Sequence, residues 1–86
     1  MKILICTAES GDWTAVYVNG KEAEQGHKVP LDHFLHNELV VQAFKESGIE
    51  FDYRTREYAD DAVEDMGASF PATVEELPEE GITHST

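Results

Sequence analysis

The sequence predicts an α+β fold, in which a small and mainly antiparallel sheet of three to four strands carries one principal helix, in the order ββ(β)αβ. Three observations predict it. A continuous apolar run opens the chain, an Asn-Gly pair joins two β-prone segments, and a long helical stretch precedes a strictly alternating strand. The 86 residues, 41% of them hydrophobic, are enough for one domain with one small core.

The first 25 residues predict a three-stranded meander. Residues 2–8 are apolar and rich in β-branched side chains, which is typical of a strand covered on both faces. Residues 13–18 form a second β-prone segment, and Asn19-Gly20 follows at once. Asn-Gly is the preferred pair for a type I′ hairpin turn, because both central residues need a positive φ. The polar residues 21–25 then provide the returning strand.

Residues 31–47 predict the principal helix, with Pro30 tolerated at its start and Gly48 placed as the left-handed residue after its end. Its apolar side chains form two roughly opposite stripes, one of Leu31, Leu35, Leu39 and Ala43, the other of Phe34, Val40, Val41 and Phe44. A helix that packs on one sheet needs only one apolar stripe. Two alternatives remain for what packs against the second stripe. Either the C-terminal segment folds back over it, or a second copy of the chain covers it in a homodimer.

Residues 49–56 predict a half-buried strand, because side chains alternate strictly between two directions. One direction holds Ile49, Phe51, Tyr53 and Thr55, and the other holds Glu50, Asp52, Arg54 and Arg56. We expect this strand to pair with the first one, in parallel after the helical crossover.

The C-terminal segment predicts short helical turns. Residues 59–66 indicate a short helix with Asp60 as its cap and Gly67 as its stop. Residues 73–77 indicate one turn, with Thr73 and Glu76 at capping-box spacing. The apolar residues expected to cover the second stripe of the helix are Val63, Met66, Phe70, Val74 and Leu77. We expect one domain over residues 1–77 and a disordered acidic tail over residues 78–86.

The chain carries a strong and uneven negative charge. Eighteen Asp and Glu residues against six Lys and Arg give a formal net charge of -12. No Lys or Arg follows Arg56, although nine carboxylates do. A field of one sign repels nucleic acid and anionic membranes and attracts basic surfaces. The pattern predicts a basic protein partner, without direct nucleic-acid or membrane binding, although solubility or salt adaptation would require the same charge.

The residues expected to bind that partner are acidic residues after the last strand and two aromatic residues near the hairpin: Glu57, Asp60, Asp61, Glu64, Asp65, Trp13 and Tyr17. Ordered carboxylates can imitate a phosphate backbone, and exposed aromatic rings can anchor an interface. The two aromatic residues are also compatible with core or edge packing. The most concrete form of this hypothesis is an inhibitor of a basic protein that handles nucleic acid.

No motif predicts catalysis, a cofactor or a metal site. The serines occupy no nucleophile elbow, and the glycines form no phosphate-binding loop. His33 and His36 share one surface of the predicted helix, but no third ligand follows at a recognised spacing. Cys6 lies in an apolar run, which predicts that its side chain is buried. Because Cys6 is the only cysteine, no intramolecular disulfide can form, and we expect a protein of the reducing cytoplasm. No signal peptide or membrane-spanning run is expected.

A different hypothesis is a protein that sequesters a small ligand, as a dimer, in a pocket between helix and hairpin. It requires cations and donors clustered around the cavity, for which the candidates are Lys21, His27, Lys28 and Arg54. A further alternative is that the chain is an acidic structural protein of unknown role.

Four short strings, three around the predicted hairpin and one near the C-terminus, resemble a group of known proteins. The strings are GDW at residues 11–13, YVNGK at 17–21, EQGH at 24–27 and FPATVEEL at 70–77. Together they resemble small uncharacterised proteins of phages and bacteria with a GDW, YVDGK and EGH hairpin pattern and an FPETLEEL ending. This chain departs from them at Pro30, where they more often have a capping Ser, and in its long acidic segment after Arg56. The resemblance implies an accessory or viral origin and transfers no functional residue.

Overall fold

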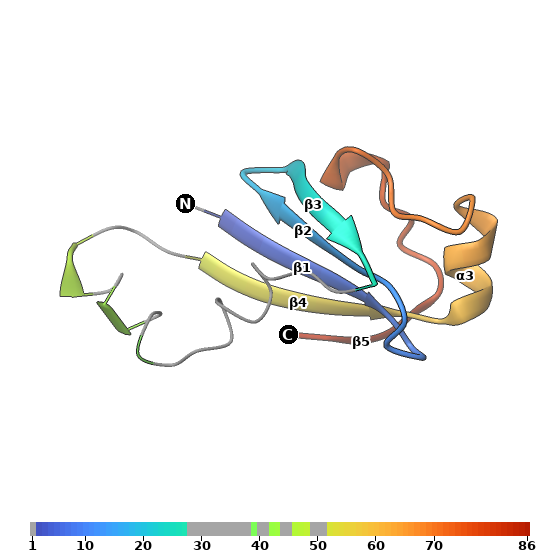
Figure 1. Cartoon of the computed structure of the whole chain (residues 1–86), viewed down its shortest axis with the longest axis horizontal. Coiled ribbons are helices and arrows are strands. Elements are labelled where there is room, and N and C mark those ends of the chain that lie inside the picture. Colours follow the sequence, from blue (N-terminus) through green and yellow to red (C-terminus); the bar gives the residue numbers. More distant parts are fainter. Residues whose placement is uncertain (1, 28–38, 40–41, 44–45, 49–51) are drawn as a thin grey trace.

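A computed structural model of the protein describes residues 2–27, 39, 42–43, 46–48 and 52–86 (Figure 1). Its main feature is a five-stranded mixed sheet in the order β3-β2-β1-β4-β5. The elements are β1 (Lys2–Ala8), β2 (Thr14–Val18), β3 (Lys21–Gly26), β4 (Asp52–Tyr58), the helix α3 (Asp60–Asp65), the 3-10 turn η1 (Val74–Glu76) and β5 (Ile82–Ser85). The fold is α+β, with one more strand than the largest sheet predicted.

Most of the predicted helix 31–47 lies outside the described residues, as do Lys28, Pro30, His33 and His36. Within that span Leu39, Gln42, Ala43 and Glu46 have helical backbone and exposed side chains. The two-stripe argument and the homodimer that depends on it therefore remain predictions.

The predicted meander is confirmed. β1 pairs antiparallel with β2, and β2 pairs antiparallel with β3. Asn19 and Gly20 between β2 and β3 have φ values of 51° and 86°, both positive as a type I′ turn requires. β1 also pairs with β4, in parallel, with Lys2 opposite Asp52 and Ala8 opposite Tyr58. The parallel pairing predicted between the first strand and the strand that follows the helix 31–47 is therefore confirmed.

Residues 82–85 form a strand where the sequence predicted a disordered tail. β5 pairs antiparallel with β4, with Glu57 opposite His84. The backbone N–H of Ala59 donates to the Gly81 carbonyl at 2.8 Å, and that of Thr86 donates to the Thr55 carbonyl at 3.0 Å. The outer edge of β4 has backbone groups that need partners, and β5 supplies them although its own side chains are mostly exposed.

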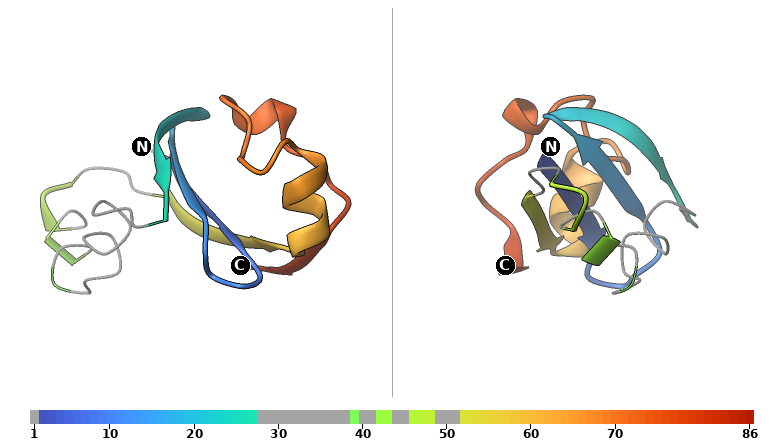
Figure 2. Two further views of the ribbon diagram at one scale, coloured as in Figure 1. Left: turned by 45° about the vertical axis from the view of Figure 1, so that its right-hand side comes forward. Right: turned by 90° about the vertical axis from the view of Figure 1, so that its left-hand side faces the viewer.

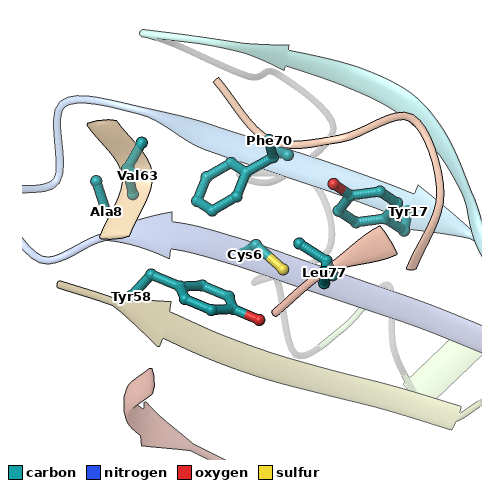
Figure 3. Close-up of a cluster of buried hydrophobic side chains, with 8 residues drawn as sticks. Cys6, Ala8, Tyr17, Tyr58, Val63, Phe70 and Leu77 are labelled. Carbon is teal, nitrogen blue, oxygen red and sulfur yellow. The ribbon is translucent and has the colours of Figure 1, made fainter. Parts of the chain in front are cut away.

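The larger hydrophobic cluster joins one face of the sheet to the C-terminal segment, as the labelled side chains in Figure 3 show. Its buried members are Cys6, Ala8, Ala15, Tyr17, Tyr58, Val63, Phe70 and Leu77. Val63, Phe70 and Leu77, which we expected to cover the helix 31–47, pack on the sheet, and what covers that helix lies outside the described residues. The small side chains of β1 and β2 leave room for the larger ones above them. Figure 2 shows α3 and η1 on this same side of the sheet.

A second cluster lies on the opposite face, since alternate residues of a strand point to opposite sides. It contains the buried Ile3, Ile5 and Val16, with Val18 and Tyr53 packed against them. Among the described residues this cluster consists of strand residues alone. Both faces of β1 are buried, as its continuous apolar run predicted.

The ends of α3 and η1 differ from the predicted caps. Ala59 is the N-cap residue of α3, without a side-chain hydrogen bond. The Oδ1 atom of Asp60 instead accepts a hydrogen bond from the Ser10 N–H at 3.1 Å, so Asp60 ties the β1–β2 turn to α3. Gly67 has a φ of 94° and follows the end of the helix as predicted. Thr73 is the N-cap of η1, but its side chain makes no capping bond, and the predicted capping box is not formed.

Candidate acidic binding site

The four carboxylates of α3 form two pairs on two sides of the helix. Asp60 and Glu64 are four residues apart, as are Asp61 and Asp65, so each pair shares one side. All four side chains are exposed. The only ion pair between residues that the structure describes is Arg54 with Asp52 on β4, at 3.2 Å. Within this part of the chain no Lys or Arg neutralises the carboxylates of α3, and they form an ordered negative surface.

One pair lies beside Trp13. Asp60 and Glu64 line a pocket of about 330 Å³ together with Trp13, His27 and Asp12. The β1–β2 turn contributes Asp12 and Trp13, and His27 follows the end of β3. The fold therefore brings part of the predicted acidic set and one of the two predicted aromatic residues into a single pocket, which we call the Trp13 pocket.

The indole of Trp13 is held in place by Gln25. Its Nε1–H donates to Gln25 Oε1 at 2.9 Å. Gln25 is itself fixed to the backbone of Phe70, since its Nε2 donates to the Phe70 carbonyl and its Oε1 accepts from the Phe70 N–H, both at 3.0 Å. Because Phe70 is a core residue, the aromatic wall of the pocket is positioned before any ligand arrives. In the sequence, Gln25 appeared only within the EQGH string, and no role was predicted for it.

His27 packs against the indole ring. The two ring centroids are 4.9 Å apart, with the planes at 83°. The Nδ1–H of His27 donates to the Asp12 carbonyl at 2.8 Å. Asp12, Asp60, Glu64 and the indole ring of Trp13 thus line a pocket to which no Lys or Arg of the described residues contributes, and this lining favours a cation rich in hydrogen-bond donors.

Two residues of the predicted binding set, Glu57 and Tyr17, lie away from the exposed surface of α3 and from the Trp13 pocket. Glu57 is on β4, where alternation places its side chain on the opposite face of the sheet from Tyr58 and the α3 side. Its Oε2 atom accepts a hydrogen bond from Thr83 Oγ1 at 2.6 Å. Tyr17 is fully buried, and its hydroxyl donates to the Pro71 carbonyl at 2.6 Å. The prediction of a surface contact at Tyr17 is therefore wrong, because residues 70–77 cover that side of β2.

The other carboxylate pair of α3 lines a different groove. Asp61 and Asp65 face Glu76 and Glu80 across a cavity of about 540 Å³. The described residues contain no group of His, Cys, Asp or Glu that could hold a metal ion. This groove lacks an aromatic wall and matches the Trp13 pocket only in charge.

The predicted cluster of cations around a cavity is only partly present. Arg54 lines a third cavity, of about 540 Å³, together with Lys2 and Arg56. Lys21 is not part of its lining, and His27 belongs to the Trp13 pocket. Lys28 lies outside the described residues.

Cys6 is a buried, unreactive thiol. Burial raises its pKa from 9.0 to about 12, against the opposing effect of Arg56. Burial also raises the pKa of Tyr17 and of Tyr58. Each of these groups is neutral when protonated, and the folded state keeps the proton to a higher pH than the unfolded chain does. Stability from these groups is therefore complete below the unfolded pKa and is lost as the pH rises above it.

We expect the free energy of unfolding to decline between pH 9 and about 12, because the unfolded thiol ionises in that interval and the folded one does not. Urea titrations at a series of pH values measure this decline. A Cys6→Ala variant should lose stability less steeply over the same interval. Rapid reaction of the native thiol with a disulfide reagent at pH 8, at the rate of an exposed cysteine, would contradict its burial.

The chain matches no protein-family model, no curated protein and no solved structure. The resemblance to small phage and bacterial proteins therefore stays a prediction. No helix in the described part of the chain has the length and apolar character to cross a membrane.

Proposed function

We propose that the protein is a non-catalytic acidic module that binds a basic protein by taking an arginine or lysine side chain into the Trp13 pocket. The observation that carries the proposal is the lining of that pocket, where Trp13 meets the carboxylates of Asp12, Asp60 and Glu64. Following the resemblance, the most concrete version is an inhibitor of phage origin that acts on a host nucleic-acid-handling or defence protein.

The chemistry of the pocket suits a guanidinium or ammonium group. A cation over an indole ring gains about 0.5–2 kcal/mol, depending on how much water is excluded. Carboxylates accept charge-assisted hydrogen bonds from the same cation, and a guanidinium can bind one of them with two parallel bonds. Because Trp13 is already fixed by Gln25, little side-chain entropy is lost when the pocket is filled.

The net charge of -12 contributes to the encounter rather than to the fit. A field of one sign raises the association rate for a basic partner, and salt screens it. Glu76 and Glu80 and the second carboxylate pair of α3 belong to this outer field. An acidic surface that serves solubility alone depends on total charge and is indifferent to which carboxylates carry it. The proposal instead requires the pair beside Trp13.

Trp13 is the only tryptophan, so its fluorescence reports on the pocket directly. We expect a short arginine-rich peptide to change the Trp13 emission in a saturable manner, and a peptide of the same length with glutamate in place of arginine to leave it unchanged. Binding should weaken strongly between about 0.05 and about 0.5 M salt, because salt screens exposed charges. Emission that does not respond to the arginine peptide at the lower salt concentration would contradict the proposal.

A further inference from the structure

A cavity lies where half of the Lys and Arg residues of this acidic chain come together. Lys2, Arg54 and Arg56 line a cavity of about 540 Å³, in the size range of small-ligand pockets. The cavity shares no lining residue with the Trp13 pocket. Because β1 and β4 are paired in parallel, Leu4 is directly opposite Arg54, and the cations project beside an apolar floor.

Among the described residues that line the cavity, three cations and two carboxylates leave a surplus of one positive charge. The Nε atom of Arg54 lies 3.2 Å from Oδ1 of Asp52, so the charges of these two β4 residues offset each other. Lys2 and Arg56 then stand against a single further carboxylate, Glu75. One surplus positive charge matches a monoanion better than a dianion.

Arg56 is the cation best placed to hold that anion. It is half-buried, and its Nη1 donates to the Tyr58 hydroxyl at 3.3 Å, which in turn donates to the Pro78 carbonyl at 2.6 Å. Among the described residues no carboxylate lies within 4.0 Å of its guanidinium. A guanidinium has five N–H donors, so donors remain after the bond to Tyr58. A partly desolvated charge without a counter-ion favours an anionic ligand.

We propose that this cavity binds a small organic carboxylate. The carboxylate pairs with the guanidinium of Arg56, with the ammonium of Lys2 beside it, and the apolar body lies on Leu4 and Val74. The site is distinct from the Trp13 pocket in charge and in lining, so it does not depend on the function proposed above.

Hexanoate is a suitable probe, because it combines one carboxylate with a short apolar chain. Titrated into the ¹⁵N-labelled protein, it should shift the amide resonances of Gly20 and Val74 in a saturable manner. Hexanol, which lacks the charge, should bind far more weakly, and so should inorganic phosphate, which lacks the apolar body. Phosphate that binds as tightly as hexanoate, or hexanol that does so, would overturn the assignment of a carboxylate.

Arg56→Gln should weaken hexanoate binding about tenfold or more, the loss expected for one charge-assisted contact. Lys21→Gln is the matched control, since it removes one positive charge from a residue outside the cavity lining and should change the affinity less than about twofold. Arg56→Lys keeps the charge without the planar fork and should fall between the two. Equal losses in Arg56→Gln and Lys21→Gln would overturn the site, and a urea titration of each variant verifies that it is folded.

Discussion

The double substitution Asp60→Asn with Glu64→Gln will weaken binding of an arginine-rich peptide by about 10- to 100-fold. Both carboxylates line the Trp13 pocket, where the incoming cation loses part of its water and gains most from a charged acceptor. The asparagine side chain introduced in place of Asp60 would keep an Oδ1 atom for the hydrogen bond from Ser10, so the link between the β1–β2 turn and α3 persists. Fluorescence titration of Trp13 measures the affinity.

The matched control lies on the same helix. Asp61→Asn with Asp65→Asn removes the same two charges, from the side of α3 that faces the other groove. We expect this variant to bind within about threefold of the unaltered protein, because only the long-range field changes and salt screens that field. Equal losses in the two double variants would mean that total charge alone decides binding, and the Trp13 pocket would have no particular role.

Gly81→Ala will destabilise the protein by about 2–4 kcal/mol, from strain at a positive φ together with overpacking. Gly81 has a φ of 86°, and a methyl group there would collide with the Cβ atom of Ala62 on α3. Gly20→Ala is the matched control, because Gly20 has the same φ of 86° and its added methyl group would meet nothing within 4 Å. It should lose only about 1–2 kcal/mol.

Urea denaturation of the two glycine variants separates backbone strain from the collision with α3. The difference between them tests whether residues 78–86 are folded against the helix. In a disordered tail, Gly81→Ala would leave the unfolding free energy unchanged, because neither strain nor contact exists there. Equal destabilisation of the two variants would show that the contact between Gly81 and Ala62 is absent.

The elements that the sequence predicted correctly have strong local signals. The run before Ala8 is continuously apolar because β1 is buried on both faces, and Asn19-Gly20 satisfies the φ requirement of its own turn. Alternation in β4 reflects two faces with different neighbours, and Gly67 marks the end of α3. Each of these features depends on residues that are close in the chain.

β5 escaped prediction because its stability comes from backbone partners on β4. The sequence Ile82–Ser85 is polar and short, and mostly exposed, so it has neither the apolar alternation nor the length that indicates a strand. Tyr17 was misplaced for a related reason. Its burial depends on the segment around Pro71, which is distant in sequence and reaches β2 only in the folded protein.

The candidate site was predictable in its parts and not in its assembly. Charge pattern selected Asp60 and Glu64, and hairpin position selected Trp13. Nothing in the sequence indicated that α3 would pack beside the β1–β2 turn, since that contact arises from Val63 in the core and from the bond between Ser10 and Asp60. The separation of Glu57 from the other carboxylates required the strand register.

The contact between a bound arginine and the indole ring tests the central claim most directly. In a complex with an isotope-labelled arginine peptide, intermolecular nuclear Overhauser effects should connect the arginine δ-methylene protons to the ring protons of Trp13, and the largest amide shifts should fall on Asp60 and Glu64. If these effects are absent, and amide shifts of equal size occur at Glu75, Glu76, Glu79 and Glu80 as well, the cation pocket at Trp13 is contradicted.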